Sequence, residues 1–129
     1  GIAGATEAPP LAELERLLEG LERRLGREPG DAICDRLAGG LRRYLARGTG
    51  EPAEDMTSFE LRLLARRHGW PERVQRGIQE AMGVADRTRF GRAAADEAGL
   101  RRAIAAARDS AREIDRLLAA AAAAEEAAG

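Results

Sequence analysis

Lysine is absent from this chain, so all 21 of its basic residues are arginine. Against these stand 22 acidic residues, which gives a formal net charge of −1. A surface that binds nucleic acid through its phosphates normally needs an excess of positive charge. The charge balance therefore argues against a general nucleic-acid-binding protein, and the missing lysine is better explained by a GC-rich genome than by a function.

Cysteine and histidine each occur once, as Cys34 and His68. A lone cysteine cannot form an intramolecular disulfide, so folding needs no oxidising compartment and a cytoplasmic location fits best. We expect Cys34, beside Ile33, to be a small core residue rather than a reactive thiol. His68 has no companion nucleophile or ligand set and reads as a polar residue near a helix C-terminus. The sequence therefore predicts no metal site, no cofactor and no enzyme activity.

Aromatic residues make up only 3% of the chain, and β-branched residues are also few. β-sheets favour both kinds, whereas the abundant Ala, Leu, Arg and Glu are strong helix formers. At 129 residues, we expect one all-α domain, a compact bundle of about five helices of which the last is long.

Long apolar runs are also lacking, since the alanine run at 119–124 is too short to cross a bilayer and no signal peptide is visible. The chain begins with glycine rather than methionine, so we expect a piece of something longer. Any membrane anchor would then lie outside this sequence.

Leucines spaced alternately three and four residues apart predict the first helix. It follows a flexible leader at residues 1–8, and Pro9-Pro10 suits its start. A second helix, capped by Asp31, is predicted by a similar stripe, and its Gly39-Gly40 pair is expected where a neighbouring helix approaches closely. The two stripes consist of Leu11, Leu14, Leu18, Leu21 and Leu25, then Ile33, Leu37, Leu41, Tyr44 and Leu45.

The stretch "MTSFE" predicts the start of a third helix, because Thr57 and Glu60 have the spacing of a capping box and Met56 that of a staple residue. This helix is expected to run to about His68, with Phe59, Leu63 and Leu64 facing inward.

Pro71 then suits the start of a fourth helix. A long fifth helix completes a helical domain at 9–118, before an alanine-rich tail at 119–129 that is expected to fray. The apolar stripes of these two helices are Val74, Ile78 and Met82, then Leu100, Ile104, Ala107, Ala111, Ile114 and Leu118.

The stretch "ADRTRFGR", residues 85–92, allows two interpretations. In the structural one, Asp86 caps or pairs near the end of the fourth helix with Arg87 or Arg89, and Phe90 is buried between the third, fourth and fifth helices. In the functional one, three arginines form a patch that faces a partner protein. These are Arg87, Arg89 and Arg92.

Residues 58–82 also have the outline of a helix-turn-helix, with Gly69 in the turn. The second helix of that motif would offer its polar side chains to a DNA groove. A small DNA-binding or regulatory protein is therefore the alternative function. The side chains concerned are Glu72, Arg73, Gln75, Arg76 and Gln79.

Three stretches within residues 41–114 occur in a familiar order. "LRRYLARGTGEPAEDMTSFEL" contains Leu-Arg-x-Tyr-Leu around Tyr44, a Gly-Pro loop, Met-Thr and Glu-Leu; "ADRTRFGR" and "LRRAIAAARDSAREI" follow. This pattern resembles the cytoplasmic C-terminal region of Bat aerotolerance-type (BatD-like) membrane proteins and their short single-span relatives. Between Asp86 and Phe90 the family commonly has an apolar residue and a lysine, where this chain has Arg87, Thr88 and Arg89.

The resemblance implies a non-catalytic helical interaction domain that forms the cytoplasmic part of a membrane-anchored accessory protein. Its partners would be a MoxR-type AAA ATPase or a von Willebrand factor A protein encoded nearby. Tethering to the inner membrane would use a segment outside this chain. The family offers no established catalytic residues to carry over.

Overall fold

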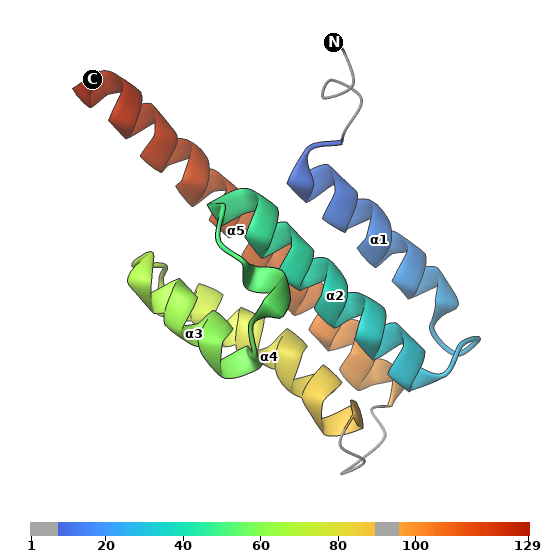
Figure 1. Cartoon of the computed structure of the whole chain (residues 1–129). Coiled ribbons are helices and arrows are strands. Elements are labelled where there is room, and N and C mark those ends of the chain that lie inside the picture. The colour runs from blue at the N-terminus through green and yellow to red at the C-terminus, as the bar shows by residue number, and fades with distance from the viewer. Residues whose placement is uncertain (1–7, 90–95) are drawn as a thin grey trace.

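The computed structural model describes residues 8–89 and 96–129. These residues form five α-helices and one short 3-10 helix, with the longest helix last, so the predicted all-α class is confirmed (Figure 1). The elements are α1 (Pro10–Arg24), α2 (Gly30–Thr49), η2 (Ala53–Asp55), α3 (Ser58–Arg67), α4 (Glu72–Arg89) and α5 (Glu97–Ala128).

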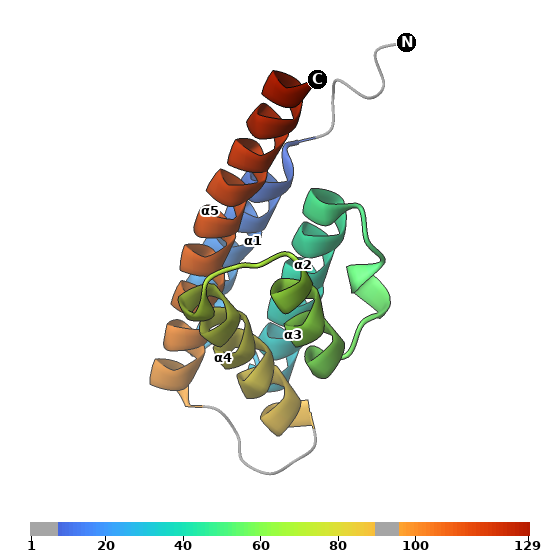
Figure 2. The same ribbon diagram turned by 90° about the vertical axis from the view of Figure 1, so that its left-hand side faces the viewer.

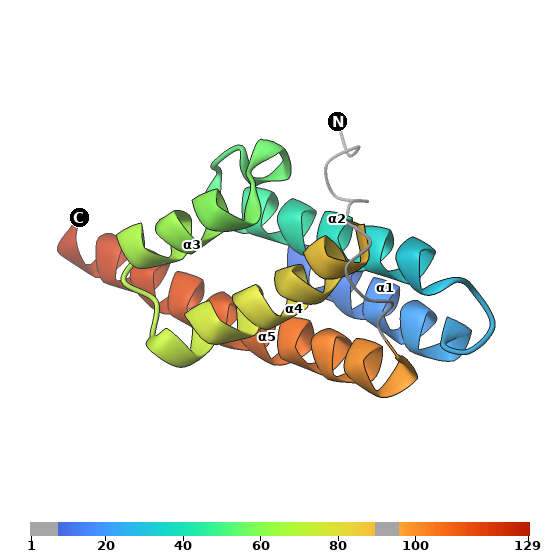
Figure 3. The same cartoon turned by 90° about the horizontal axis from the view of Figure 1, so that it is seen from below.

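Four of the five helices enclose the core. α1 packs on α2 and α5, while α4 packs on α2 and α5 from the other side (Figure 2). The remaining helix, α3, packs chiefly on α4 and lies on the side of the bundle opposite α1 (Figures 1 and 3). The architecture is therefore a four-helix bundle with one peripheral helix.

The predicted leucine stripes form the core. Leu14, Leu18 and Leu21 of α1 and Leu37 and Leu41 of α2 are each at most 2% exposed. Burying such a side chain contributes about 1.5–3 kcal/mol, so these stripes are the main source of stability.

The expected close approach at the glycine pair is found at one of the two positions. A Cβ added to Gly40 would lie 2.1 Å from the Leu17 side chain of α1, whereas one added to Gly39 would meet nothing within 4 Å. Only Gly40 therefore faces the neighbouring helix, because successive residues point about 100° apart around a helix.

The helix starts were predicted with mixed success. The capping box is confirmed, since the Glu60 N–H donates to the Thr57 hydroxyl (3.1 Å) and the Thr57 N–H donates to the Glu60 carboxylate (2.9 Å). The prediction that Asp31 caps α2 was wrong, because the N-cap is Pro29 and the helix begins at Gly30, two residues before the Ala32 that an Asp31 cap implies. Asp31 thus lies inside the first turn, where its negative charge interacts favourably with the positive end of the helix dipole.

The inward face of α3 was predicted incorrectly. Phe59 is 62% exposed and Leu63 is 36% exposed, whereas Leu61, Leu64 and Ala65 are fully buried. A peripheral helix that packs chiefly on one neighbour can bury only a narrow stripe, and Leu61 lies about 200° around the helix from Phe59. Leu64 was placed correctly, while Phe59 and Leu63 point away from the core.

The alanine-rich tail continues α5 as a helix to Ala128, and residues 119–129 are all exposed. Its last turns project beyond the other helices (Figure 1). Fraying of this tail remains a prediction that hydrogen exchange can test. Within the described ranges, no helix is long and apolar enough to cross a membrane.

Candidate functional site

Two clefts lie on either side of the C-terminal half of α4, and Asp86 lines both of them. The first, which we call the η2-side cleft, measures about 230 Å³ and is lined by Asp35, Ala38, Gly39, Arg42, Glu54, Ala85, Asp86 and Arg89. The second, which we call the α3–α4 cleft, measures about 260 Å³ and is lined by Ser58, Phe59, Arg62, Gln79, Gly83 and Asp86.

A third cleft, of about 400 Å³, lies at the surface between α4 and α5. Apart from Asp109, its charged side chains pair with one another or with α1: Arg73 and Arg116 with Glu113, and Arg112 with Glu15. Hydrogen bonding to Arg73 is the main cause of the lowered pKa of Glu113. The internal pairing leaves this larger cleft with little unsatisfied charge to offer a ligand.

Asp86 joins α4 to α3. The Ser58 hydroxyl, in the first turn of α3, donates a hydrogen bond of 2.6 Å to its carboxylate. Among the described residues Asp86 forms no ion pair, so the predicted pairing with Arg87 or Arg89 was wrong. Ser58 and Asp86 are 28 positions apart in the chain, and local sequence patterns cannot reveal such a contact.

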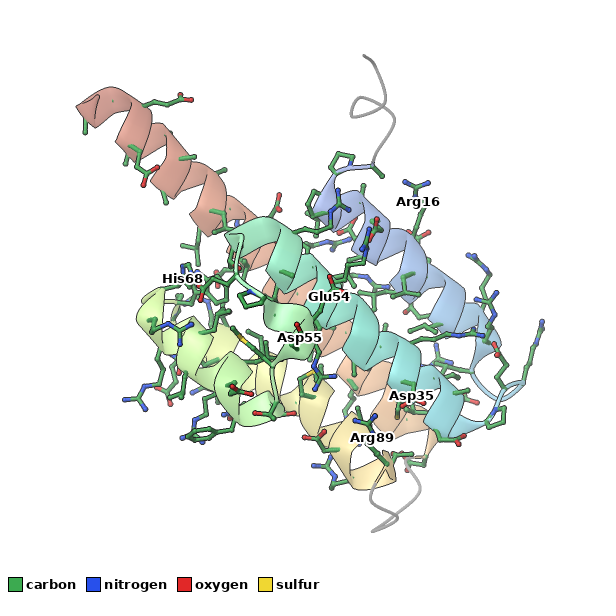
Figure 4. All side chains as sticks on the ribbon, viewed as in Figure 1. Arg16, Asp35, Glu54, Asp55, His68 and Arg89 are labelled. Atoms are coloured by element: carbon green, nitrogen blue, oxygen red, sulfur yellow. The ribbon has the colours of Figure 1, made fainter. Side chains whose placement is uncertain are left out.

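The predicted arginine patch is divided between the two clefts. Arg89 lines the η2-side cleft, where it lies on the same side of the bundle as Asp35 and Glu54 (Figure 4). The guanidinium of Arg87 lies beside Gly83 of the α3–α4 cleft, 3.2 Å from where a Cβ of that glycine would be. Arg92 and Phe90 lie outside the described residues, so the burial of Phe90 remains a prediction.

Apolar and cationic side chains lie close together on the exposed face of α3 and the adjacent part of α4, which we call the rim of the α3–α4 cleft; Phe59 and Arg62 line the cleft itself. Phe59 and Leu63 are the exposed large hydrophobic residues of the described chain. Arg62 and Arg66, on the same helix, and Arg87, on α4, are exposed and make no hydrogen bond or ion pair with any described residue. Sequence reasoning missed this site because it assigned Phe59 and Leu63 to the core.

The lone histidine has a structural contact. The His68 ring nitrogen Nε2 lies 2.6 Å from a carboxylate oxygen of Glu51, and the ring stacks on Trp70 with centroids 5.1 Å apart. Hydrogen bonds from His68 and then Arg67 lower the pKa of Glu51. These contacts fasten the C-terminal end of α3 to the loop that follows α2.

The lone cysteine is buried in α2, with its Sγ 3.6 Å from the Thr88 hydroxyl of α4. Burial raises the pKa of the Cys34 thiol, which is the opposite of what a reactive thiolate needs. In the described ranges, no group of three or more His, Cys, Asp or Glu side chains could hold a metal ion.

Tyr44, part of the sequence pattern shared with the BatD-like region, links α2 to α5. Its buried hydroxyl lies 3.0 Å from both the Ala111 carbonyl and the Asp115 carboxylate. Burial, followed by the charge of Asp115, raises the pKa of Tyr44, so this phenol is held neutral as a donor. The residue therefore has a packing role.

Helices α3 and α4 and the turn between them have the outline of a helix-turn-helix, and Gly69 adopts the left-handed conformation (φ 68°) in that turn. Several of the side chains that would read DNA are, however, engaged within the molecule. Arg73 pairs with Glu113, and the Gln75 amide donates to the Trp70 carbonyl at 2.9 Å. DNA contact through this helix would have to break these interactions.

Comparisons of the chain with family models, curated proteins and solved structures find no match. The resemblance to the BatD-like region therefore remains a prediction from the sequence. What the molecule can bind has to be argued from its own surface.

Proposed function

We propose that this chain is a non-catalytic, helical protein-interaction domain that docks a partner through the rim of the α3–α4 cleft. The observation that carries the proposal is the exposure of Phe59 and Leu63 beside arginines without an acidic partner in the described chain. By the sequence resemblance, the domain would be the cytoplasmic part of a membrane-anchored accessory protein. The partner would be a MoxR-type ATPase or a von Willebrand factor A protein.

The chain has only two phenylalanines, and one of them, Phe59, leaves its large apolar side chain exposed to water. Contiguous exposed apolar side chains mark interaction sites more often than isolated ones do, and aromatic residues and arginine are enriched among the residues that dominate binding energy. The rim of the α3–α4 cleft combines exposed apolar side chains with arginines within a few helical turns. This composition supports a protein partner.

The clefts give less support to an enzyme. Ser58 in the α3–α4 cleft donates to the Asp86 carboxylate directly, with no histidine between them to act as the general base of a serine nucleophile. His68 lies ten residues further along, at the opposite end of α3 and about 15 Å away at the rise of a helix. The arrangement favours structural rather than chemical roles for both residues.

The DNA-binding alternative receives less support from the contacts, since Arg73 and Gln75 are held within the molecule. A titration with duplex DNA at physiological salt should give no sequence-selective complex. Selective binding below micromolar concentration would replace the docking proposal with the helix-turn-helix one.

Capture by the immobilised chain tests the docking proposal. The proteins supplied in purified form are a MoxR-type ATPase and a von Willebrand factor A protein, the partners that the resemblance implies. We expect one of them to be retained, and the Phe59→Ser/Leu63→Ser double variant to lose most of the retention. Arg16→Glu, on the exposed face of α1 at the opposite side of the bundle, is the control (Figure 4). Equal retention by the double variant would move the docking surface elsewhere, and failure to retain either protein would refute the assigned partners.

A further inference from the structure

We propose that the η2-side cleft binds a free α-amino acid with a cationic side chain, whose carboxylate pairs with Arg89 and whose α-ammonium group pairs with Asp35. This cleft lies on the other side of α4 from the α3–α4 cleft, so the inference goes beyond the docking function and does not depend on it. The separation of the charges, the open floor and the size of the cleft support it.

The two walls of the cleft carry opposite charges that do not meet. Asp35 lies on α2 and Arg89 on α4, and both line the cleft (Figure 4). Neither makes a hydrogen bond or an ion pair with any described residue, so the two side chains do not contact each other across the cleft. Elsewhere, arginines and acids of neighbouring helices pair directly, as Arg73 of α4 does with Glu113 of α5 at 2.7 Å. A molecule that carries both charges can bridge the gap between Asp35 and Arg89.

A zwitterion is complementary to this pair of side chains. A guanidinium group binds a carboxylate through two parallel hydrogen bonds, and a carboxylate accepts charge-assisted hydrogen bonds from an ammonium group. A simple carboxylate or a simple amine would satisfy one wall and leave the other without a partner. An α-amino acid holds both groups on one carbon atom and can therefore satisfy both walls.

Glu54, on η2, adds a third charge to the cleft and makes no hydrogen bond or ion pair with a described residue. In Figure 4 it lies at the η2 end of the cleft, whereas Asp35 and Arg89 lie toward the start of α2 and the end of α4. An amino acid held at Asp35 and Arg89 can extend its side chain toward Glu54. A cationic side chain is the complementary one.

The remaining charged side chains of the cleft are held by the protein itself. The Nε–H of Arg42 donates to the Met56 carbonyl (2.9 Å), and the Asp86 carboxylate accepts the Ser58 hydroxyl (2.6 Å). Both keep their charges, so the lining has three carboxylates against two guanidinium groups. An amino acid with a cationic side chain has one net positive charge at neutral pH, which balances this lining.

The floor of the cleft consists of small residues, Ala38 and Gly39 of α2 and Ala85 of α4. Gly39 lies in the middle of a helix, where glycine is less favourable than alanine. Packing does not require a glycine at this position, because a Cβ there would meet nothing within 4 Å, in contrast to the adjacent Gly40. The missing side chain instead opens the cleft and lets a ligand approach the helix backbone.

The size of the cleft also fits a single amino acid. At about 230 Å³ it is smaller than the ~300–1,000 Å³ of sites for drug-sized ligands. Among the described residues that line it, none is aromatic, so a nucleotide base would find no ring on which to stack. Volume and lining therefore favour an amino acid over a nucleotide.

The probe is L-lysine, titrated into the isotope-labelled chain while its backbone amide shifts are followed by NMR. We expect saturable shifts at the Gly39 and Ala85 amides, with a dissociation constant on the order of 1 mM because the cleft is open to water. Three analogues each lack one group: cadaverine lacks the carboxylate, Nα-acetyl-L-lysine the α-ammonium group, and L-norleucine the side-chain cation. Each should bind about tenfold more weakly, since each loses one charge-assisted contact.

Three variants assign these contacts. Arg89→Gln should weaken lysine about tenfold and abolish its advantage over cadaverine, because the carboxylate has lost its partner. By the same logic, Asp35→Asn should abolish the advantage over Nα-acetyl-L-lysine, and Glu54→Gln the advantage over L-norleucine. Arg87→Gln, on the other side of α4, is the matched control and should leave lysine binding unchanged.

A fourth variant, Gly39→Leu, fills the floor of the cleft and should abolish the lysine-induced shifts. An unchanged or raised melting temperature shows that each variant is folded.

The inference is overturned if lysine gives no saturable shifts up to ~20 mM, or if any of the three analogues binds the parent as tightly as lysine does. A loss of binding in Arg87→Gln as large as that in Arg89→Gln would also overturn it, because the attraction would then be a general effect of surface charge. None of these outcomes bears on docking, which the capture experiment with the Phe59→Ser/Leu63→Ser variant tests separately.

Discussion

Helices α1 and α3 lie on opposite sides of the same bundle and treat their charged residues differently. On α1, Glu13 binds Arg43 and Arg47 of α2 at 2.6 and 2.9 Å. Glu15 and Glu22 bind Arg112 and Arg108 of α5. On α3, Arg62 and Arg66 make no such contact within the described chain, and Phe59 is exposed.

This difference in ion pairing follows from the number of helices on which α1 and α3 pack. Because α1 packs on both α2 and α5, acids on its two flanks meet arginines on both. Because α3 packs chiefly on α4, one side of it has no other helix to meet. Three acids on the flanks of α1 are thus paired within the molecule, whereas Arg62 and Arg66 of α3 have no partner among the described residues.

The largest predicted effect separates the two faces of α3. Leu64 is fully buried, so Leu64→Ala should lower the free energy of unfolding by about 3 kcal/mol through lost burial and a residual cavity. Phe59→Ala, which removes the larger side chain, should change it by less than ~0.5 kcal/mol because that side chain is exposed. Urea unfolding measures both. If Phe59→Ala costs as much as Leu64→Ala, Phe59 belongs to the core and the docking surface disappears.

The second prediction compares two adjacent glycines of α2. Gly40→Ala places a methyl group 2.1 Å from the Leu17 side chain, which must move, and we expect a net loss of about 1 kcal/mol. Gly39→Ala meets nothing and should raise stability by up to ~1 kcal/mol, since alanine favours helices. Thermal unfolding should therefore shift in opposite directions. If Gly40→Ala also raised stability, α1 and α2 would not be in close contact at Gly40.

Most of the fold could be predicted from the sequence because the signals of helices are local. The stripe from Leu14 to Leu25 and the capping box at Thr57 and Glu60 depend on residues three or four apart, and both predictions were confirmed. The face of α3 could not be predicted in this way. Phe59 and Leu61 are both apolar, and only the position of α4 decides which of them is buried.

The candidate site was predicted only in part, for the same reason. Arg87 and Arg89 are exposed as expected, yet they flank different clefts, since α3 and η2 lie on different sides of α4. The contact of Ser58 with Asp86 and the exposure of Phe59 both depend on how α3 docks. Tertiary packing, rather than local pattern, creates this site.

The third prediction concerns the N-terminal cap that holds α3, with its exposed Phe59 and Leu63, in place. Thr57→Ala removes the acceptor of the Glu60 N–H and should lower the free energy of unfolding by about 1 kcal/mol. Thr57→Ser keeps a hydroxyl and is the matched control, with a smaller loss. A urea midpoint unchanged by Thr57→Ala would show that the first turn of α3 contributes nothing to stability.

The smallest predicted effect compares α1, whose Glu13 forms ion pairs, with α3, whose Arg62 does not. Hydrogen bonding to Arg43 is the main cause that lowers the pKa of Glu13. A carboxyl whose pKa is lower in the folded chain stabilises it above the ordinary value of 4.5, and this contribution disappears as the pH falls through the lowered pKa. Glu13→Gln should therefore cost less than about 1 kcal/mol at pH 7, as expected of an exposed pair.

The cost of Glu13→Gln should shrink below about pH 4, where the parent loses the same charge, and in 1 M salt, where the attraction is screened. Arg62→Gln on α3 is the matched control: with no partner in the described chain, its removal should leave the urea midpoint unchanged at every pH. If Arg62→Gln destabilises as much as Glu13→Gln, the arginines of α3 already serve the fold. They would then not be available to a partner, and the contrast between the two helices would be lost.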